Sequence, residues 1–141
     1  MKRLSLLLLV LVLLGGALFF IKAKPGQPAP KVKASLPVEL TGYVNYSDAN
    51  LETAKLKGKS VLFFAATAWC QTCIGLEKEI IARSSQIPAD VTILKVDYDN
   101  DKAMKKKYAV VYQHTLVFLD QNGQELTRSA GDDFDQLLAR L

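Results

Sequence analysis

The sequence predicts an α/β domain, with a central mixed β-sheet flanked by helices, that follows an N-terminal transmembrane helix. Three apolar runs, residues 60–66, 91–96 and 115–119, have the length and composition of strands buried on both faces. Between and after them lie stretches with apolar residues at helical spacing. A separate apolar run, residues 4–21, is long enough to cross a membrane.

The N-terminal apolar run predicts a single-pass anchor in the cytoplasmic membrane. Only Ser5, Gly15 and Gly16 interrupt it, and as a helix it would span about 27 Å. A cleaved signal peptide has a similar basic start and apolar core, but no convincing small-x-small cleavage site follows here. We therefore expect an uncleaved signal anchor over residues 1–23.

Residues 24–37 predict an extended tether, because four prolines alternate with small and basic residues. The first 37 residues carry six basic side chains and no acidic one, whereas the remainder carries 12 basic and 14 acidic side chains. The net charge of +4 thus belongs to the N-terminal segment, which favours a membrane surface and argues against nucleic acid as a partner. The folded domain is expected over residues 38–141.

Two opposing signals bear on the side of the membrane that the domain occupies. Four lysines after the apolar run outnumber Lys2 and Arg3 before it, and the positive-inside rule alone would keep the domain in the cytoplasm. An apolar run behind a basic start is, however, what export machinery recognises. We expect the domain to be extracytoplasmic.

The first half of the domain predicts strand, helix, strand and helix. Residues 43–46 form a short strand, Ser47 caps a helix that ends at Gly58, and the strand 60–66 follows. The next helix has an apolar stripe facing inward and a polar face, and it ends before Pro88. The stripe comprises Leu76, Ile80, Ile81 and Ile87, and the outward face carries Glu77, Lys78 and Arg83.

The second half predicts a strand, a short helix, a β-hairpin and a closing helix. Asn100 or Asp101 caps the short helix after the strand 91–96. Asn122-Gly123 is a hairpin turn between the strand 115–119 and residues 124–128. Asp132 or Asp133 opens the last helix, whose apolar residues recur at helical spacing: Phe134, Leu137, Leu138 and Leu141.

Cys70 and Cys73 are the only cysteines, and they lie where a buried strand is followed by a helix. The first sulfur then lies at the positive end of a helix dipole, which favours its thiolate. The second lies one turn further on and can attack a mixed disulfide formed at the first. A purely structural disulfide closing so small a loop would stabilise little. Two cysteines also exclude a four-thiolate zinc site within one chain.

The motif Trp69-Cys70-Gln71-Thr72-Cys73, the spacing from Lys95 to Tyr108 and the Gly131 after the hairpin resemble the thioredoxin superfamily. The resemblance extends from residue 43 to residue 141. It implies a thioredoxin-like fold and a thiol–disulfide oxidoreductase that uses a redox-active disulfide and no other cofactor. Its partners would be protein thiols and disulfides. A membrane protein would supply or accept electrons, since the chain has no flavin or nicotinamide motif.

Departures from the family pattern lie at positions that border the active site. Phe64 stands where thioredoxins bury an acidic residue, so the proton relay proposed for thioredoxins is expected to be absent. Lys95, which would normally pair near that acid, is then expected to be a strand-edge or snorkelling lysine. Gln71 and Thr72 replace the Gly-Pro of thioredoxins, so the reduction potential does not carry over from the family.

His114 is the only histidine, and it occupies the position of the family's cis-proline, facing the two sulfurs. It is a polar residue filling a loop, a base that accepts a thiol proton, or the third ligand with Cys70 and Cys73 of zinc or Cu(I). We expect a trans peptide here, since a cis non-proline peptide costs about 2.5–4 kcal/mol, and a locally altered substrate groove at Thr115. Trp69 packs on the sheet or forms a contact platform, with packing the larger expected contribution.

These observations favour a membrane-tethered thiol–disulfide oxidoreductase that acts on extracytoplasmic proteins. In this hypothesis Cys70 attacks, Cys73 resolves and His114 tunes the pair. Two alternatives come from other classes: a copper or zinc delivery module built on the same three residues, and a non-catalytic adaptor that uses the groove for binding alone. The direction of electron flow stays open.

Overall fold

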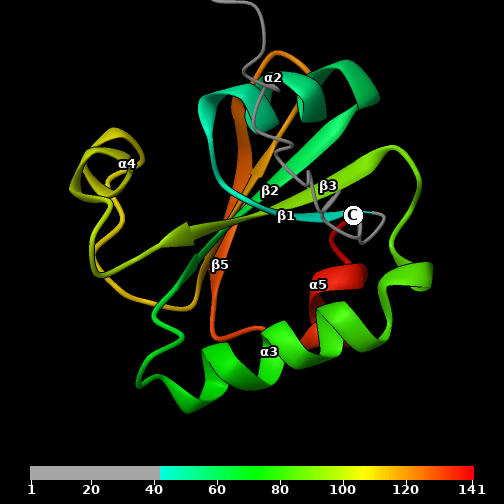
Figure 1. The fold of residues 1–141 in the computed structure, drawn as a ribbon. Coiled ribbons are helices and arrows are strands. Elements are labelled where there is room, and N and C mark those ends of the chain that lie inside the picture. The colour runs from blue at the N-terminus through cyan, green and yellow to red at the C-terminus, as the bar shows by residue number, and fades with distance from the viewer. Residues whose placement is uncertain (1–41) are drawn as a thin grey trace, which may run out of the picture. The chain divides into compact units, whose positions relative to one another are not determined.

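A computed structural model describes residues 42–141, which form a five-stranded β-sheet with helices on both faces (Figure 1). The strands are ordered β1-β3-β2-β4-β5 across the sheet. In chain order the elements are β1 (Tyr43–Asn45), α2 (Asp48–Lys57), β2 (Lys59–Ala65), α3 (Gln71–Ala82), η1 (Ser84–Gln86), β3 (Val91–Asp97), α4 (Lys102–Lys107), β4 (Thr115–Leu119), β5 (Glu125–Ala130) and α5 (Phe134–Leu138).

The sheet is mixed, as the sequence predicts. β3 runs parallel to both β1 and β2, whereas β4 runs antiparallel to β2 and β5. The central strand β2 aligns Phe64 with Val96 of β3 and with Thr115 of β4. Because helices cover both faces of β2 and β3, these strands are almost continuously apolar. β2 leads directly to the turn that carries the cysteines.

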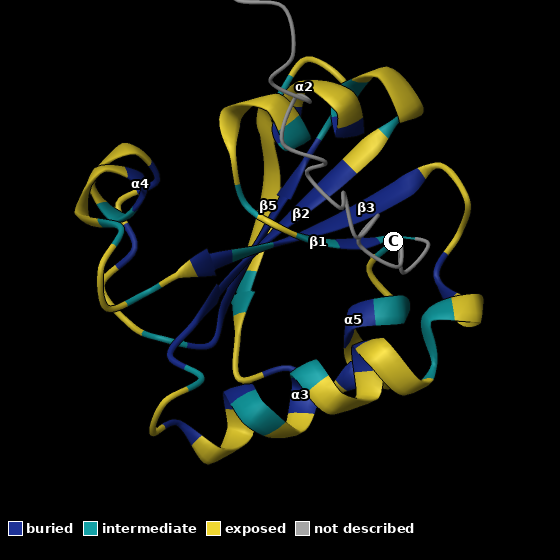
Figure 2. Ribbon diagram, viewed as in Figure 1, coloured by how far each residue is buried: buried dark blue, intermediate teal, exposed yellow. Residues whose placement is uncertain are grey.

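Two hydrophobic cores lie on opposite faces of the sheet (Figure 2). In one core α3 and α5 pack against residues of the sheet, and in the other α2 and α4 pack against residues of the sheet. Side chains alternate along a strand, so Phe63 of β2 joins the α3/α5 core and Phe64 joins the α2/α4 core. Both Cys70 and Cys73 belong to the α3/α5 core, which therefore supports the site.

The helix caps are close to those predicted. Ser47 caps α2 and Asp101 caps α4, each with a side-chain oxygen that accepts a backbone N–H of the first turn. Asp133, rather than Asp132, caps α5 in a reciprocal capping box with Gln136. These caps fix the ends of elements that are only five to ten residues long.

The prediction for α3 was wrong in three respects. The helix ends at Ala82 and the short turn η1 follows, so Ile87 is buried from the loop beyond it. Ile81, expected to face inward, is 42% exposed. Glu77, expected to face outward, is turned toward the sheet and pairs with Lys95.

The predicted transmembrane helix over residues 1–23 and the tether over residues 24–37 lie outside the described residues. Within residues 42–141, no helix is both long enough and apolar enough to span a membrane. The membrane anchor and the extracytoplasmic location therefore stay predictions.

Candidate active site

Cys70 lies in the turn between β2 and α3, and its sulfur caps the helix. Its backbone is extended, with φ −81° and ψ 103°, and its Sγ accepts the backbone N–H of Cys73 at 3.2 Å. The hydroxyl of Thr72 makes a second contact with this sulfur, also at 3.2 Å. A helix N-terminus carries a partial positive charge, so the turn favours a thiolate at Cys70.

The pKa of the Cys70 thiol is below its ordinary value. Burial by itself raises that pKa, but hydrogen bonds from the Cys73 thiol, the Thr72 hydroxyl and the backbone N–H groups of both residues favour the thiolate and outweigh burial. Cys70 keeps 6% of its surface exposed, whereas Cys73 is fully buried. Cys70 is thus the sulfur that ionises more readily and that a partner can reach.

Cys73 has the opposite character. Its pKa is raised, first by burial and then by its hydrogen bond to Cys70, although backbone N–H groups of Ala66 and His114 partly offset this effect. Both thiols are free in the structure. An ionised outer thiol and a protonated inner thiol can attack a disulfide in succession, provided that a group nearby accepts the inner proton.

His114 lies immediately before β4 with an unusual backbone. Its φ of +57° is in the left-handed region, which few residues other than glycine adopt. Its N–H donates to the carbonyl of Phe64 at 2.8 Å, and its carbonyl accepts the N–H of Gly131 at 3.0 Å. The expectation of a trans peptide is confirmed, since residues 42–141 contain no cis peptide bond.

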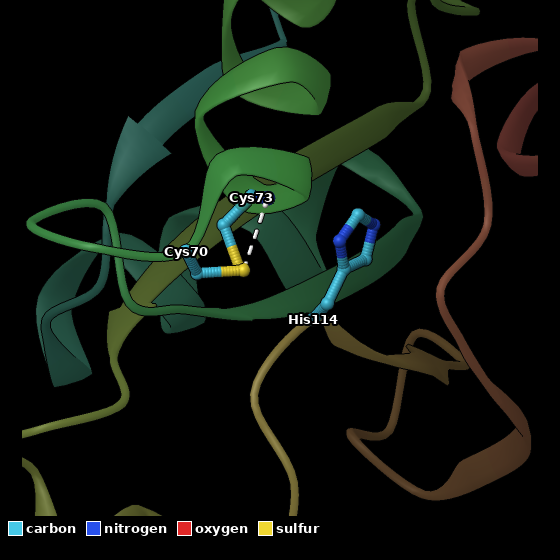
Figure 3. A group of neighbouring side chains, drawn as sticks. All are labelled: Cys70, Cys73 and His114. Atoms are coloured by element: carbon cyan, nitrogen blue, oxygen red, sulfur yellow. Dashed lines mark hydrogen bonds between the residues drawn. The ribbon is translucent and has the colours of Figure 1, made fainter.

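The imidazole of His114 is buried opposite the two cysteines (Figure 3). Nε2 lies 2.8 Å from the backbone carbonyl oxygen of Asp132, and because a carbonyl only accepts, Nε2 carries the hydrogen. In the neutral ring Nδ1 is then an acceptor. Nδ1 faces the cysteines in Figure 3 and has no hydrogen-bond partner among the described residues. Donor atoms of Cys70, Cys73 and His114 lie within 4.8 Å of one another.

The other predicted site residues surround this group. Trp69 is 54% exposed and its indole N–H donates to the carboxylate of Asp99 at 3.2 Å, which favours a contact platform over packing on the sheet. Gln71 is exposed in the first turn of α3. Thr115 is buried, and its hydroxyl donates to the carbonyl of Tyr112 at 2.7 Å.

The site has two cysteines at the start of α3, beside a sheet with the strand order β1-β3-β2-β4-β5. A family comparison agrees with this geometry. Residues 43–141 match the sequence profile of the Thioredoxin family. The chain belongs to the thioredoxin family. The predicted fold and the predicted enzyme class, thiol–disulfide oxidoreductase, are those of this family, whose members work through a redox-active disulfide.

The chain is also similar in sequence to individual proteins of known name. The chain is 39% identical over 77 residues to a thioredoxin of Chlamydia trachomatis, covering 54% of this chain and 72% of that protein. It is 32% identical over 79 residues to the thiol:disulfide interchange protein DsbD of Actinobacillus pleuropneumoniae, which covers 52% of this chain but spans only 14% of that protein.

Solved structures give the same result. Trxlp from Edwardsiella tarda superimposes with a TM-score of 0.60 at 29% identity, covering 70% of this chain and 95% of that one. Thioredoxin NaTrxh from Nicotiana alata also gives a TM-score of 0.60, at 25% identity, covering 84% of this chain and 95% of that one.

Phe64 stands at the position of the acid that thioredoxins bury. Its side chain lies on the face of the sheet opposite to the cysteines. Phe64 packs in the α2/α4 core and reaches the site only through its carbonyl. Lys95 is neither the strand-edge nor the snorkelling lysine that the sequence predicts, because β3 lies between β1 and β2 and the side chain pairs with Glu77. Its Nζ lies 2.6 Å from Glu77 Oε1, which also accepts the hydroxyl of Tyr43 at 2.8 Å. The side chains of Glu77 and Lys95 are 19% and 27% exposed, so this ion pair is largely buried.

Glu77 is predicted from the sequence to face outward, but in the structure it faces the sheet. A signal was present, since Cys73, Leu76, Glu77 and Ile80 follow the i, i+3, i+4, i+7 spacing of one helix face. The charge of Glu77 predicts an outward orientation. The partners that hold it inward, Tyr43 of β1 and Lys95 of β3, are distant in the sequence. The Asp132 carbonyl that orients His114 has no sequence signal, because any residue supplies a carbonyl.

A groove of about 220 Å³ borders His114 on the side of α5, with Thr72, Gly75 and Gly131 among its lining residues. Large apolar side chains are exposed at positions that shortly precede site residues in the chain: Trp69 before Cys70, and Val111 and Tyr112 before His114. The site therefore combines a reactive sulfur with a surface that an extended polypeptide can contact.

Proposed function

We propose that this protein is a membrane-tethered thiol–disulfide oxidoreductase that exchanges disulfides with extracytoplasmic proteins. The observation that carries this proposal is the arrangement of a low-pKa thiol at Cys70, a protonated thiol at Cys73 and the bare Nδ1 of His114. Membership of the thioredoxin family supports the class of reaction. The apolar run and basic tether before residue 38 support the membrane attachment.

In the reducing direction, the Cys70 thiolate attacks one sulfur of a substrate disulfide. The substrate S–S bond breaks, one substrate sulfur leaves as a thiolate, and a mixed disulfide joins Cys70 to the other. Cys73 then loses its proton and attacks Cys70 Sγ, which releases the second substrate sulfur as a thiolate. Two electrons pass from the cysteine pair to the substrate, and the reverse sequence oxidises a dithiol.

His114 is the proton acceptor in this scheme. Its Nδ1 lone pair faces the thiols, while the hydrogen on Nε2 is held by the carbonyl of Asp132. Nδ1 takes the proton of Cys73 as that thiol attacks, and the imidazolium returns it to the departing substrate thiolate. Backbone N–H groups of Ala66 and His114 stabilise the Cys73 thiolate while it forms. The imidazole thus takes the part of the acid that Phe64 replaces.

The substrates of this activity are polypeptides rather than small disulfides. The exposed ring of Trp69 and the exposed side chains of Val111 and Tyr112 provide apolar contacts for a chain lying across Cys70. A membrane protein resets the cysteine pair after each turnover, supplying electrons if the pair reduces substrates and accepting them if it oxidises them.

Trapping of the mixed disulfide tests the exchange reaction. The full chain with Cys73→Ser is incubated with insulin as a disulfide substrate, and the products are separated without reductant. We expect this variant to accumulate a covalent adduct through Cys70, and the matched Cys70→Ser variant to form none. Equal adduct from both variants, or none from either, would contradict the assignment of attacking and resolving thiols. Full function in cells of a Cys70→Ser/Cys73→Ser chain would favour the adaptor hypothesis.

Reporter fusions test the location. Alkaline phosphatase joined after Pro37 is expected to be active, and a reporter that works only in the cytoplasm is expected to be inactive at the same place. The opposite pattern would place the domain in the cytoplasm.

A further inference from the structure

The reduced site has the donor set of a soft-metal centre. We propose that Cys70, Cys73 and His114 together bind Cu(I). Their donor atoms lie within 4.8 Å of one another, compared with roughly 4.0 Å between two sulfurs that each lie about 2.3 Å from one three-coordinate ion. Small side-chain rotations therefore bring the three donors onto one ion. This inference goes beyond disulfide exchange and stands on the geometry of the reduced state.

The imidazole provides an independent reason to place a ligand here. His114 is only 6% exposed, yet its Nδ1 has no hydrogen-bond partner among residues 42–141. A buried polar atom without a partner is destabilising, and a metal ion would satisfy it. Nε2 meanwhile donates to the Asp132 carbonyl, and a metal-binding histidine typically donates its other ring N–H to an outer carbonyl in this way.

The number and kind of donors favour Cu(I) over zinc. Zinc in proteins is almost always four-coordinate, and a three-ligand zinc site keeps an open position for water or substrate. In the described part of the chain, no further His, Cys, Asp or Glu joins this group, and all three members are buried. Two thiolates and an imidazole are soft enough for Cu(I), which three donors can satisfy without a water position.

Binding requires no change of oxidation state. Cu(I) binds the Cys70 thiolate and displaces the proton of the Cys73 thiol, which leaves to solvent, and two Cu–S bonds and one Cu–N bond form. Since Cu(I) would bind both sulfurs, the metal-bound protein cannot form the Cys70–Cys73 disulfide. Metal binding and disulfide formation are therefore mutually exclusive at this site.

The first test is a competition titration. The reduced full chain is titrated anaerobically with Cu(I) as its acetonitrile complex, against bicinchoninate as a chromophoric chelator. We expect one Cu(I) per chain and a loss of affinity of roughly 100-fold in His114→Asn, the upper end of what loss of an outer-shell partner causes. Asparagine tolerates the positive φ of His114, whereas proline does not. Leu126→Ala, which removes an exposed side chain of β5 and no donor, is expected to bind Cu(I) as the unmodified chain does.

The second test uses the fact that the chain has one histidine. Its two ring nitrogens give a single pair of ¹⁵N signals, so ligation is read at a known residue. We expect the Nδ1 signal to shift on addition of Cu(I) while the Nε2 hydrogen is retained. Unchanged affinity in His114→Asn, an unshifted Nδ1, or one Zn(II) bound per chain with no Cu(I) would each overturn the proposal. The insulin-trapping test contains no metal, so failure of either idea leaves the other testable.

Discussion

The hydroxyl of Thr72 is predicted to hold the Cys70 thiolate at neutral pH, and Thr72→Val tests this. Oγ1 lies 3.2 Å from Cys70 Sγ, and valine keeps the shape of the side chain while removing the donor. A hydrogen bond to a charged group contributes about 1.5–3 kcal/mol. Because Thr72 is exposed and water partly replaces the bond, we take about 1.4 kcal/mol, which corresponds to a tenfold change in equilibrium.

The sign of the effect follows from which form is stabilised. Loss of the donor destabilises the thiolate, so the pKa of Cys70 rises and the ionised fraction falls roughly tenfold at any pH well below its midpoint. At high pH both proteins are fully ionised. There the variant should react slightly faster, since thiolate nucleophilicity rises with pKa.

Alkylation by iodoacetamide across a pH series measures this fraction. Because Cys73 is fully buried, the reagent is expected to modify Cys70. Mass spectrometry of the digested protein confirms which cysteine carries the label. Gln71→Ala is the matched control, since Gln71 is also exposed in the first turn of α3 and makes no hydrogen bond to the sulfur. The pH midpoint of Cys70 alkylation is expected to be higher in Thr72→Val than in the unmodified chain and in Gln71→Ala. The same midpoint in all three proteins would refute the reasoning.

Three further predictions concern the free energy of unfolding, measured by urea denaturation of the full chain. Glu77→Gln should cost about 1–2 kcal/mol, because it leaves the largely buried ammonium of Lys95 without its counter-charge. Phe64→Asp should cost at least about 3 kcal/mol, because it places a carboxylate in the α2/α4 core, and it should not restore a relay to the cysteines. Gly58→Ala should cost more than about 1 kcal/mol, because its φ is +148° and the added Cβ would lie 2.6 Å from the Asp90 carbonyl oxygen.

Each of these changes has a matched control in the chain. Glu79→Gln removes an exposed partner of Arg83 and should be nearly neutral. Phe64→Leu keeps the core apolar and should cost less than Phe64→Asp. Gly123→Ala places an alanine at a smaller positive φ of +78°, where the added Cβ meets only the flexible end of Lys55 at 3.6 Å, so it should cost less than Gly58→Ala. If a control lowers the free energy of unfolding as much as its test variant does, the cause given for the test variant is wrong.

The order of strands and helices is predictable from this sequence because local signals agree. Continuous apolar runs identify β2 and β3, and residues 115–119 are predicted to be a strand and form β4 without a shift of boundary. Ser47 and Asp133 are N-caps, as side-chain oxygens at helix starts predict. The CxxC motif between a buried strand and a helix likewise identifies where the chemistry lies.

What the sequence does not predict depends on contacts between distant segments. Glu77 faces inward because α3 lies over β3, where Lys95 is, and the charge of an isolated glutamate indicates the opposite. The lone pair of His114 faces the cysteines because of two non-local features: a backbone held between Phe64 and Gly131, and the Asp132 carbonyl that fixes the tautomer. These features are visible only once the sheet is assembled.

The reduction potential of the Cys70–Cys73 couple tests the central claim most directly. The full chain is equilibrated in metal-free buffers that contain graded ratios of reduced to oxidised glutathione or dithiothreitol, and the fraction of intramolecular disulfide is counted by mass spectrometry. The account predicts a reversible two-electron transition, 29.6 mV for each tenfold change, with a midpoint between roughly −270 and −120 mV, the range of dithiol exchange catalysts. Failure to form an intramolecular disulfide, or a midpoint below about −300 mV as in structural disulfides, would contradict it.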